Sequence, residues 1–110
     1  NLVKTIITDQ EFVQVDLFDN GTIDNDTISV YHNNELVVKS AKLNTTPISL
    51  KIRNTATDRL HELVIVAENL GEIPPNTALM VVTAGRKRYE IFLSSTEEKN
   101  AKVIIEYQRN

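Results

Sequence analysis

Acidic and amide side chains gather in one short stretch of the chain that could bind a metal ion. The sequence DNGTIDNDTISVY begins at Asp19 and brings Asp24 and Asp26 close to Asn20 and Asn25. Carboxylate, amide and backbone oxygens are the ligands that calcium prefers in proteins. The spacing does not match an EF-hand loop, which closes with a glutamate ligand. Calcium bound by the three aspartates is therefore one prediction for this stretch.

A simple turn explains the same stretch without a metal. Asp and Asn side chains accept hydrogen bonds from nearby backbone N–H groups and tolerate left-handed backbone conformations. Gly21 lies among them and allows a sharp reversal of the chain. We favour the turn and keep calcium binding as the alternative. Calorimetric titration of the wild type and of Asp24→Ala with calcium would distinguish the two.

A second group of polar residues is expected to lie near the first. The stretch AENLGEIPPNTAL adds further candidates for a binding loop, so that the full set is Asn20, Asn25, Glu68, Asn69, Glu72 and Asn76. These side chains fit either a calcium site or a clamp in which asparagine binds the backbone of a neighbouring loop. The clamp is the preferred interpretation, because the two prolines before Asn76 leave backbone groups in need of partners.

The two histidines of the chain are candidates for catalysis or zinc binding. His32 and His61 are both expected at the end of the fold opposite the acidic stretch, near different turns. A zinc site or a catalytic triad needs partners that converge in space, and the sequence places no second ligand beside either histidine. A hydrolase that pairs His61 with Glu62 or Glu68 is therefore only a third hypothesis.

Three cations, Arg86, Lys87 and Arg88, lie together in the sequence GRKRY. They could contact phosphate, but a solvated hairpin end that discourages edge-to-edge pairing is the favoured interpretation. The whole chain has a formal net charge of −3 and a pI near 5.3. This acidic balance argues against a general nucleic-acid binder, which would present a basic face.

Length and composition indicate one domain. The chain has 110 residues and no cysteine, which excludes disulfides and thiolate metal sites. Its longest apolar run, ALMVV at residues 78–82, has the length of a strand and predicts no membrane insertion. Because the sequence begins without an initiator methionine or a signal peptide, we expect this chain to be a domain of a longer, exported protein.

Alternating apolar and polar residues predict an all-β fold. Val13, Val15 and Leu17 alternate with polar residues, so residues 11–18 are predicted to form a strand with one buried face. The first three strands are expected in one sheet, and the strand at residues 61–69 is expected to be buried on both faces. About nine short strands predict an immunoglobulin-like antiparallel β-sandwich, with a small β-barrel as the alternative.

The order of the strands predicts which connections lie together. If consecutive strands run antiparallel, the connections at residues 19–25, 40–47, 69–76 and 95–100 share one end of the sandwich. The two hairpins near residues 32–34 and 85, and the turn at 54–59, then lie at the other end. Because sandwich folds often carry recognition on the loops at one end, the acidic end is the predicted binding region.

The two polar stretches together resemble a β-sandwich module of exported and cell-envelope proteins of Gram-negative bacteria. In that module the pattern looks like D-N-G-x-I-D-G-D-x-I-S-V followed by N-x-G-x-I-P-P-N-T-A, and the similarity covers most of residues 19–94. This chain departs from the pattern at Asn25, where glycine is usual, and Asn is the residue that best replaces glycine in a left-handed turn. The resemblance implies an extracytoplasmic accessory domain without an assigned reaction.

These observations lead to one preferred function and one alternative. The preferred hypothesis is a non-catalytic binding or structural accessory module of an exported or envelope-associated bacterial protein, with a protein or a carbohydrate surface as its partner. The alternative is a calcium-stabilised carbohydrate-binding module, which requires Asp19, Asp24 and Asp26 to converge on one point.

Overall fold

Residues that favour β-strands are frequent in this chain, and apolar side chains alternate with polar ones in several segments. The structure is a computed structural model that describes residues 2–19, 27–43, 46–69, 77–94 and 100–109. Val, Ile, Thr and aromatic residues pack well on a pleated surface, and they dominate these segments. The described residues contain no helix that could cross a membrane. They form nine strands, which are β1 (Leu2–Thr8), β2 (Phe12–Asp19), β3 (Thr27–His32), β4 (Glu35–Lys42), β5 (Ile48–Arg53), β6 (Leu60–Asn69), β7 (Thr77–Ala84), β8 (Lys87–Ser94) and β9 (Asn100–Tyr107).

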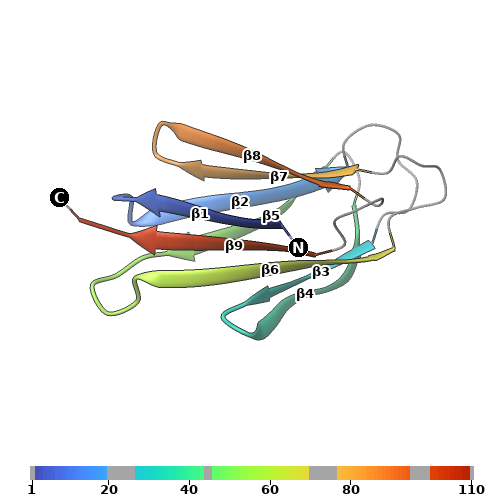
Figure 1. Cartoon of the computed structure of the whole chain (residues 1–110), viewed down its shortest axis with the longest axis horizontal. Coiled ribbons are helices and arrows are strands. Elements are labelled where there is room, and N and C mark those ends of the chain that lie inside the picture. Colours follow the sequence, from blue (N-terminus) through green and yellow to red (C-terminus); the bar gives the residue numbers. More distant parts are fainter. Residues whose placement is uncertain (1, 20–26, 44–45, 70–76, 95–99, 110) are drawn as a thin grey trace.

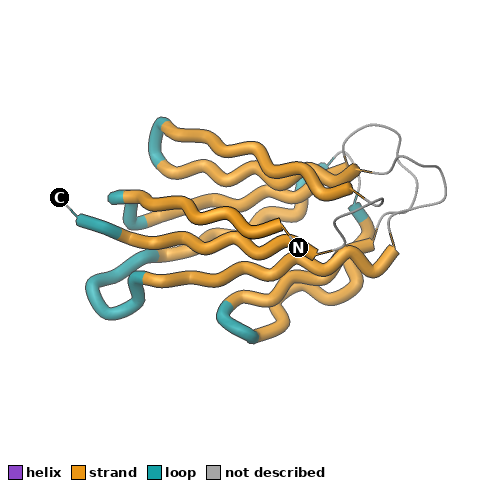
Figure 2. The backbone as a smooth tube through the Cα atoms, in the orientation of Figure 1, coloured by secondary structure: helices purple, strands orange, loops and turns teal. Residues whose placement is uncertain are grey.

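The strands form two sheets that pack face to face (Figure 1, Figure 2). One sheet has the order β1-β9-β6-β3-β4, and the other has the order β5-β2-β7-β8. β1 pairs with β9 in parallel, and the other pairings of the described strands are antiparallel. Each sheet keeps two free edges, so the strands do not close into a barrel. The predicted β-sandwich is confirmed.

The expectation that the first three strands share a sheet is wrong. β1 and β3 belong to the five-stranded sheet, whereas β2 lies between β5 and β7 in the other sheet. β1 pairs in parallel with β9, from Leu2 opposite Ala101 to Thr8 opposite Tyr107. The short turn after β1 therefore crosses from one sheet to the other. A period-two pattern shows that a strand has a buried face, but it does not show which strand lies beside it.

The hydrophobic core lies between the two sheets. Every second residue of β2 and of β9 points inward and is buried. Burying one Val, Ile or Leu side chain contributes about 1.5 to 3 kcal/mol to the free energy of unfolding. The core therefore holds the two sheets together. Its largest fully buried apolar members are Ile6, Val13, Val15, Leu17, Ile28, Leu43, Leu63, Ile65, Met80 and Ile105.

The strand ends are sorted between the two ends of the sandwich (Figure 1). β2, β4, β6 and β8 finish at one end, where β3, β5, β7 and β9 begin, and we call this the loop end. The hairpins β3–β4 and β7–β8 and the turn between β5 and β6 lie at the opposite end, which we call the hairpin end. This matches the predicted sorting of the connections. Residues 20–26, 44–45, 70–76 and 95–99 lie outside the described part of the chain.

β6 is buried on one face only, contrary to the expectation of two buried faces. Leu63 and Ile65 point into the core and are fully buried. Val64 and Val66 point to the other side of the five-stranded sheet and are half-buried. The continuous apolar run in β6 therefore marks a strand whose second apolar face lies on the molecular surface.

Candidate functional site

One of the three predicted calcium ligands lies in the described part of the chain. Asp19 is the last residue of β2, and its side chain follows Leu17 inward and is 6% exposed. Asp24 and Asp26 lie outside the described residues, so convergence of the three carboxylates stays a prediction. Within the described ranges, no three His, Cys, Asp or Glu side chains are grouped so that they could hold a metal ion.

Two of the six binding-loop candidates are described, and both are at the end of β6. Asn69 pairs with Thr27 in the sheet, and Glu68 lies on the solvent-facing side of the same strand. The other four candidates lie outside the described residues. They are Asn20, Asn25, Glu72 and Asn76.

Glu68 joins two serines from neighbouring strands in a small hydrogen-bonded group. The hydroxyl of Ser29 donates to Oε1 of Glu68 at 3.0 Å, and the hydroxyl of Ser40 donates to Oε2 at 2.5 Å. The Ser29 oxygen also accepts a hydrogen bond from the backbone N–H of Ser40 at 2.9 Å. The register of β3 and β4 shifts between Ile28 and Val30, so Ser40 lies in a bulge. Its φ of 46° lies in the left-handed region.

These contacts make Glu68 a fixed anion on the sheet surface. Hydrogen bonds donated by Ser40 and Ser29 lower the pKa of Glu68, because they stabilise its charged form, and nearby Lys39 acts in the same direction. Ser29 is buried although it points away from the core. The group therefore fixes the bulge of β4 against its hairpin partner β3 and against β6, which is distant from it in sequence.

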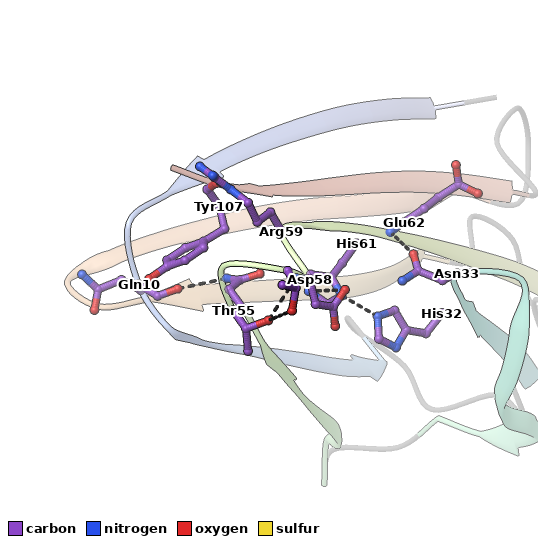
Figure 3. Close-up of polar contacts among 11 residues, drawn as sticks. Gln10, His32, Asn33, Thr55, Asp58, Arg59, His61, Glu62 and Tyr107 are labelled. Carbon is purple, nitrogen blue, oxygen red and sulfur yellow. Dashed lines mark hydrogen bonds and ion pairs between the residues drawn. The ribbon is translucent and has the colours of Figure 1, made fainter. Parts of the chain in front are cut away.

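The two histidines meet at the hairpin end (Figure 3). Nε2 of His32 and Nδ1 of His61 are 2.8 Å apart, and the two rings stack with centroids 5.0 Å apart. His61 points into the core and is 1% exposed, whereas His32 is half-buried at the end of β3. In a neutral pair, one ring must donate the hydrogen bond and the other must accept it.

The carboxylate of Asp58 indicates the direction of that hydrogen bond. Its Oδ1 lies 3.8 Å from Nε2 of His61, a buried nitrogen that makes no hydrogen bond. A proton on this Nε2 faces the negative charge and leaves Nδ1 to accept from His32. Burial and the neighbouring His61 lower the pKa of His32, whereas the carboxylates of Asp58 and Glu35 oppose the shift.

Backbone and side-chain hydrogen bonds hold the surrounding turns in place (Figure 3). Asn33 and Glu62 bind each other, because the N–H of Asn33 donates to the Glu62 carbonyl at 2.9 Å and Oδ1 of Asn33 accepts from the N–H of Glu62 at 2.8 Å. The turn before β6 closes through Thr55, whose hydroxyl accepts from the N–H of Asp58 at 3.0 Å. Nδ2 of Asn54 donates to the Gln10 carbonyl at 2.9 Å. The histidine pair is therefore set in a rigid polar end of the molecule.

Both histidines lie at the predicted end and near different turns, but the sequence did not indicate that they are in contact. β3 and β6 are not consecutive in the chain, yet they are neighbours in the sheet, with His32 opposite Leu63. The alternation of side chains along β6 also separates His61, which points inward, from Glu62 and Glu68, which point outward. The hydrolase hypothesis needs His61 beside one of these glutamates, and this geometry does not provide it.

A row of side chains crosses the outer face of the five-stranded sheet. This outer face is the side that points away from the core. In each of the four pairs of neighbouring strands, one residue lies directly opposite a residue of the next strand, and together these residues form a continuous row across the sheet. Inward neighbours such as Leu63 and Val103 are fully buried, so the aligned residues point outward. The outer row consists of Val3, Lys102, Val64, Tyr31 and Leu36.

The outer row is apolar and accessible to a partner. Val3 is 58% exposed, Tyr31 36% and Leu36 42%. Lys102 supplies its aliphatic stem to the row, and its ammonium lies 3.6 Å from the Glu62 carboxylate. Further apolar side chains lie on the same face in other rows, and they are Ile7, Leu60, Val66 and Ile104.

No local pattern predicted this surface, because it arises only from the pairing of five strands. Sequence reasoning placed the binding region at the loop end and took the apolar residues of β6 for core. We compared the chain with protein-family models, with curated proteins and with solved structures, and none of the three comparisons gave a match.

Proposed function

We propose that the chain is a non-catalytic binding module of an exported or envelope-associated bacterial protein, and that it docks a protein partner on the outer face of its five-stranded sheet. The single observation that carries the proposal is the outer row, in which apolar side chains from four strands align across the whole sheet. The assignment to an exported protein rests on the resemblance of its two polar motifs.

The chemistry of the outer face favours a protein surface as the partner. Contiguous exposed apolar patches are rare on soluble monomers and often mark interaction sites. Tyr31 is an aromatic anchor in such a patch, and Val64 beside it on the central strand supplies aliphatic area. The ion pair of Lys102 with Glu62 adds charged groups within the patch, and the fixed carboxylate of Glu68 lies towards its edge at the loop end. Protein interfaces likewise combine apolar anchors with polar contacts.

The environment of the histidines supports a non-catalytic role. His61 is buried between the sheets, and His32 and Asp58 are the groups around its ring nitrogens. A general base must come within hydrogen-bond reach of a substrate proton, and the buried ring of His61 gives a substrate no access. The pair therefore acts as a polar link between β3 and β6.

Binding through the outer face is tested with ligands selected for this protein. A displayed library of small folded scaffolds is selected on the immobilised wild-type chain, and the affinities of the enriched scaffolds are measured. For Tyr31→Ser combined with Leu36→Ser we expect a loss of affinity of about tenfold or more, because truncating interface anchors costs at least about 1.4 kcal/mol. Both residues are partly exposed, so the fold should persist.

The matched control removes an exposed aromatic residue from the other sheet. Phe92 on β8 is 51% exposed, and Phe92→Ser should leave the affinity of the same scaffolds unchanged. Equal losses in both variants, or selected scaffolds whose binding is unaffected by the outer-row substitutions, would contradict the proposal. Self-association of the wild type that the outer-row substitutions abolish would instead identify a second copy of the chain as the partner.

A further inference from the structure

The cations of the β7–β8 hairpin line a cleft at the hairpin end. The tip of this hairpin and the turn between β1 and β2 lie at the same end of the sandwich (Figure 1). The cleft between them has a volume of about 560 Å³, which is within the range of ligand sites in proteins. Arg86 and Lys87 form one wall, and Thr8, Asp9 and Gln10 form the other.

The walls of the cleft are held together by a close contact at Gly85. This residue has a φ of +62°, as the hairpin turn requires, and the side chain of Gln10 lies directly against it. A Cβ added at residue 85 would approach Cδ of Gln10 to 2.8 Å. On its other side, Nε2 of Gln10 donates to Oδ1 of the adjacent Asp9 at 2.9 Å. The contact with Gly85 therefore brings the two walls of the cleft together.

The lining combines positive charge with groups that bind hydroxyls. Arg86 and Lys87 contribute two positive charges and Asp9 one negative charge, which leaves a net charge of +1 in a chain whose total is −3. The side-chain amides of Gln10 and Gln108 can donate and accept hydrogen bonds, and Arg suits the planar oxygens of carboxylate and phosphate. Ile7 and Ala84 add apolar surface to the lining.

We infer that this cleft binds a small anionic molecule in which a carboxylate or a phosphate is attached to a hydroxylated carbon skeleton, as in a sugar acid or a sugar phosphate. Arg86 and Lys87 hold the oxyanion, and the two glutamine amides bind the hydroxyl groups. The cleft shares no residue with the outer row, although Ile7 of its lining also lies on the outer face, and the cations that carry the inference belong to the β7–β8 hairpin of the other sheet. The inference therefore stands apart from the proposed protein partner.

The inference is tested by nuclear magnetic resonance titration of the whole chain. Galacturonate and glucose 6-phosphate are the probes, and glucose and inorganic phosphate are the comparison ligands. We expect saturable shifts of the Gly85 and Arg86 backbone amides and of the Gln10 and Gln108 side-chain amides with at least one of the two probes. Glucose should give none, and phosphate should bind about tenfold more weakly than the probe that binds, since it lacks the hydroxyl contacts.

Two variants with the same change in charge assign the binding to the cleft. Arg86→Gln combined with Lys87→Gln should weaken binding of the probe about tenfold or more, because it removes both charge-assisted contacts. Lys39→Gln combined with Lys42→Gln, on β4, should leave the affinity within about twofold of the wild type. The inference is overturned if neither probe gives saturable shifts at the cleft. Equal affinities in the two variants, or phosphate binding as tight as the probe, would also overturn it.

Discussion

His32 and His61 show how one buried hydrogen bond couples the protein to pH. His61 lies in the core, and His32 reaches it from the neighbouring strand with their nitrogens 2.8 Å apart. Burial and His61 lower the pKa of His32, so the folded protein binds the proton of His32 more weakly than the unfolded chain does. Acid therefore favours the unfolded state through this residue.

The first prediction concerns the stability of the protein in mild acid. The ordinary pKa of His32 is 6.5, and its pKa in the folded protein is lower. The free energy of unfolding should be fully maintained above this ordinary value and should fall as the pH drops through it towards the lower folded-state pKa. Urea denaturation across this range should show a smaller fall for His32→Gln than for the wild type. Parallel pH profiles of the two proteins would show that His32 does not contribute.

The second prediction concerns the buried hydroxyl of Ser29. It accepts the Ser40 N–H and donates to Glu68, so Ser29→Ala leaves two groups without their partner. We expect a loss of about 1 to 3 kcal/mol in the free energy of unfolding, measured by urea denaturation. Ser49→Ala is the matched control, because Ser49 donates to Asp16 on the exposed surface, and it should cost less than about 1 kcal/mol. A larger loss in the control would contradict this account of the bulge.

At the scale of the elements, local patterns predicted the strands and turns but not the neighbours of each strand. Residues 11–18 were expected as a strand, and β2 spans Phe12–Asp19. The turns also follow from local chemistry, since Asn33 and Asn34 have φ values of 50° and 68° and Gly85 has +62°. The parallel pairing of β1 with β9 joins the two ends of the described chain, and no local pattern carries that information.

The same limit explains the errors at the candidate site. His32 and His61 are in contact because β3 and β6 pair across the chain, and the outer row exists because five strands align. Apolar residues on both sides of β6 predicted two buried faces, although one of those faces lies on the surface. Hydrophobic pattern alone does not distinguish a core face from an apolar face that lies on the molecular surface.

The third prediction separates the two asparagines of the β3–β4 hairpin. Both have positive φ, but only the side chain of Asn33 accepts a hydrogen bond from the N–H of Glu62. Asn34→Gly should leave the melting temperature unchanged or raise it slightly, because glycine adopts this conformation without strain. Asn33→Gly should lower stability by about 0.5 to 1.5 kcal/mol, since it also removes that hydrogen bond. Equal effects of the two substitutions would show that the Asn33 side chain has no role in holding the hairpin.

At the scale of the whole molecule, the sandwich presents surfaces of different chemistry. The outer face of the five-stranded sheet carries the apolar outer row, and the hairpin end carries the cleft with Arg86 and Lys87. The rigid interior between the sheets keeps these surfaces at fixed positions, as a binding scaffold requires. The loop end, where Asp19 and Glu68 begin the predicted binding region, stays a candidate for calcium.

The measurement that tests the central claim most directly is the location of the contact surface of a selected scaffold. Backbone amide shifts of the wild-type chain are recorded during titration with the tightest scaffold. We predict that the largest shifts lie on β9, β6 and β3, around Lys102, Val64 and Tyr31, and that Tyr31→Ser combined with Leu36→Ser removes them. Shifts confined to the four-stranded sheet or to the strand ends at the loop end would contradict the claim that the outer face binds the partner.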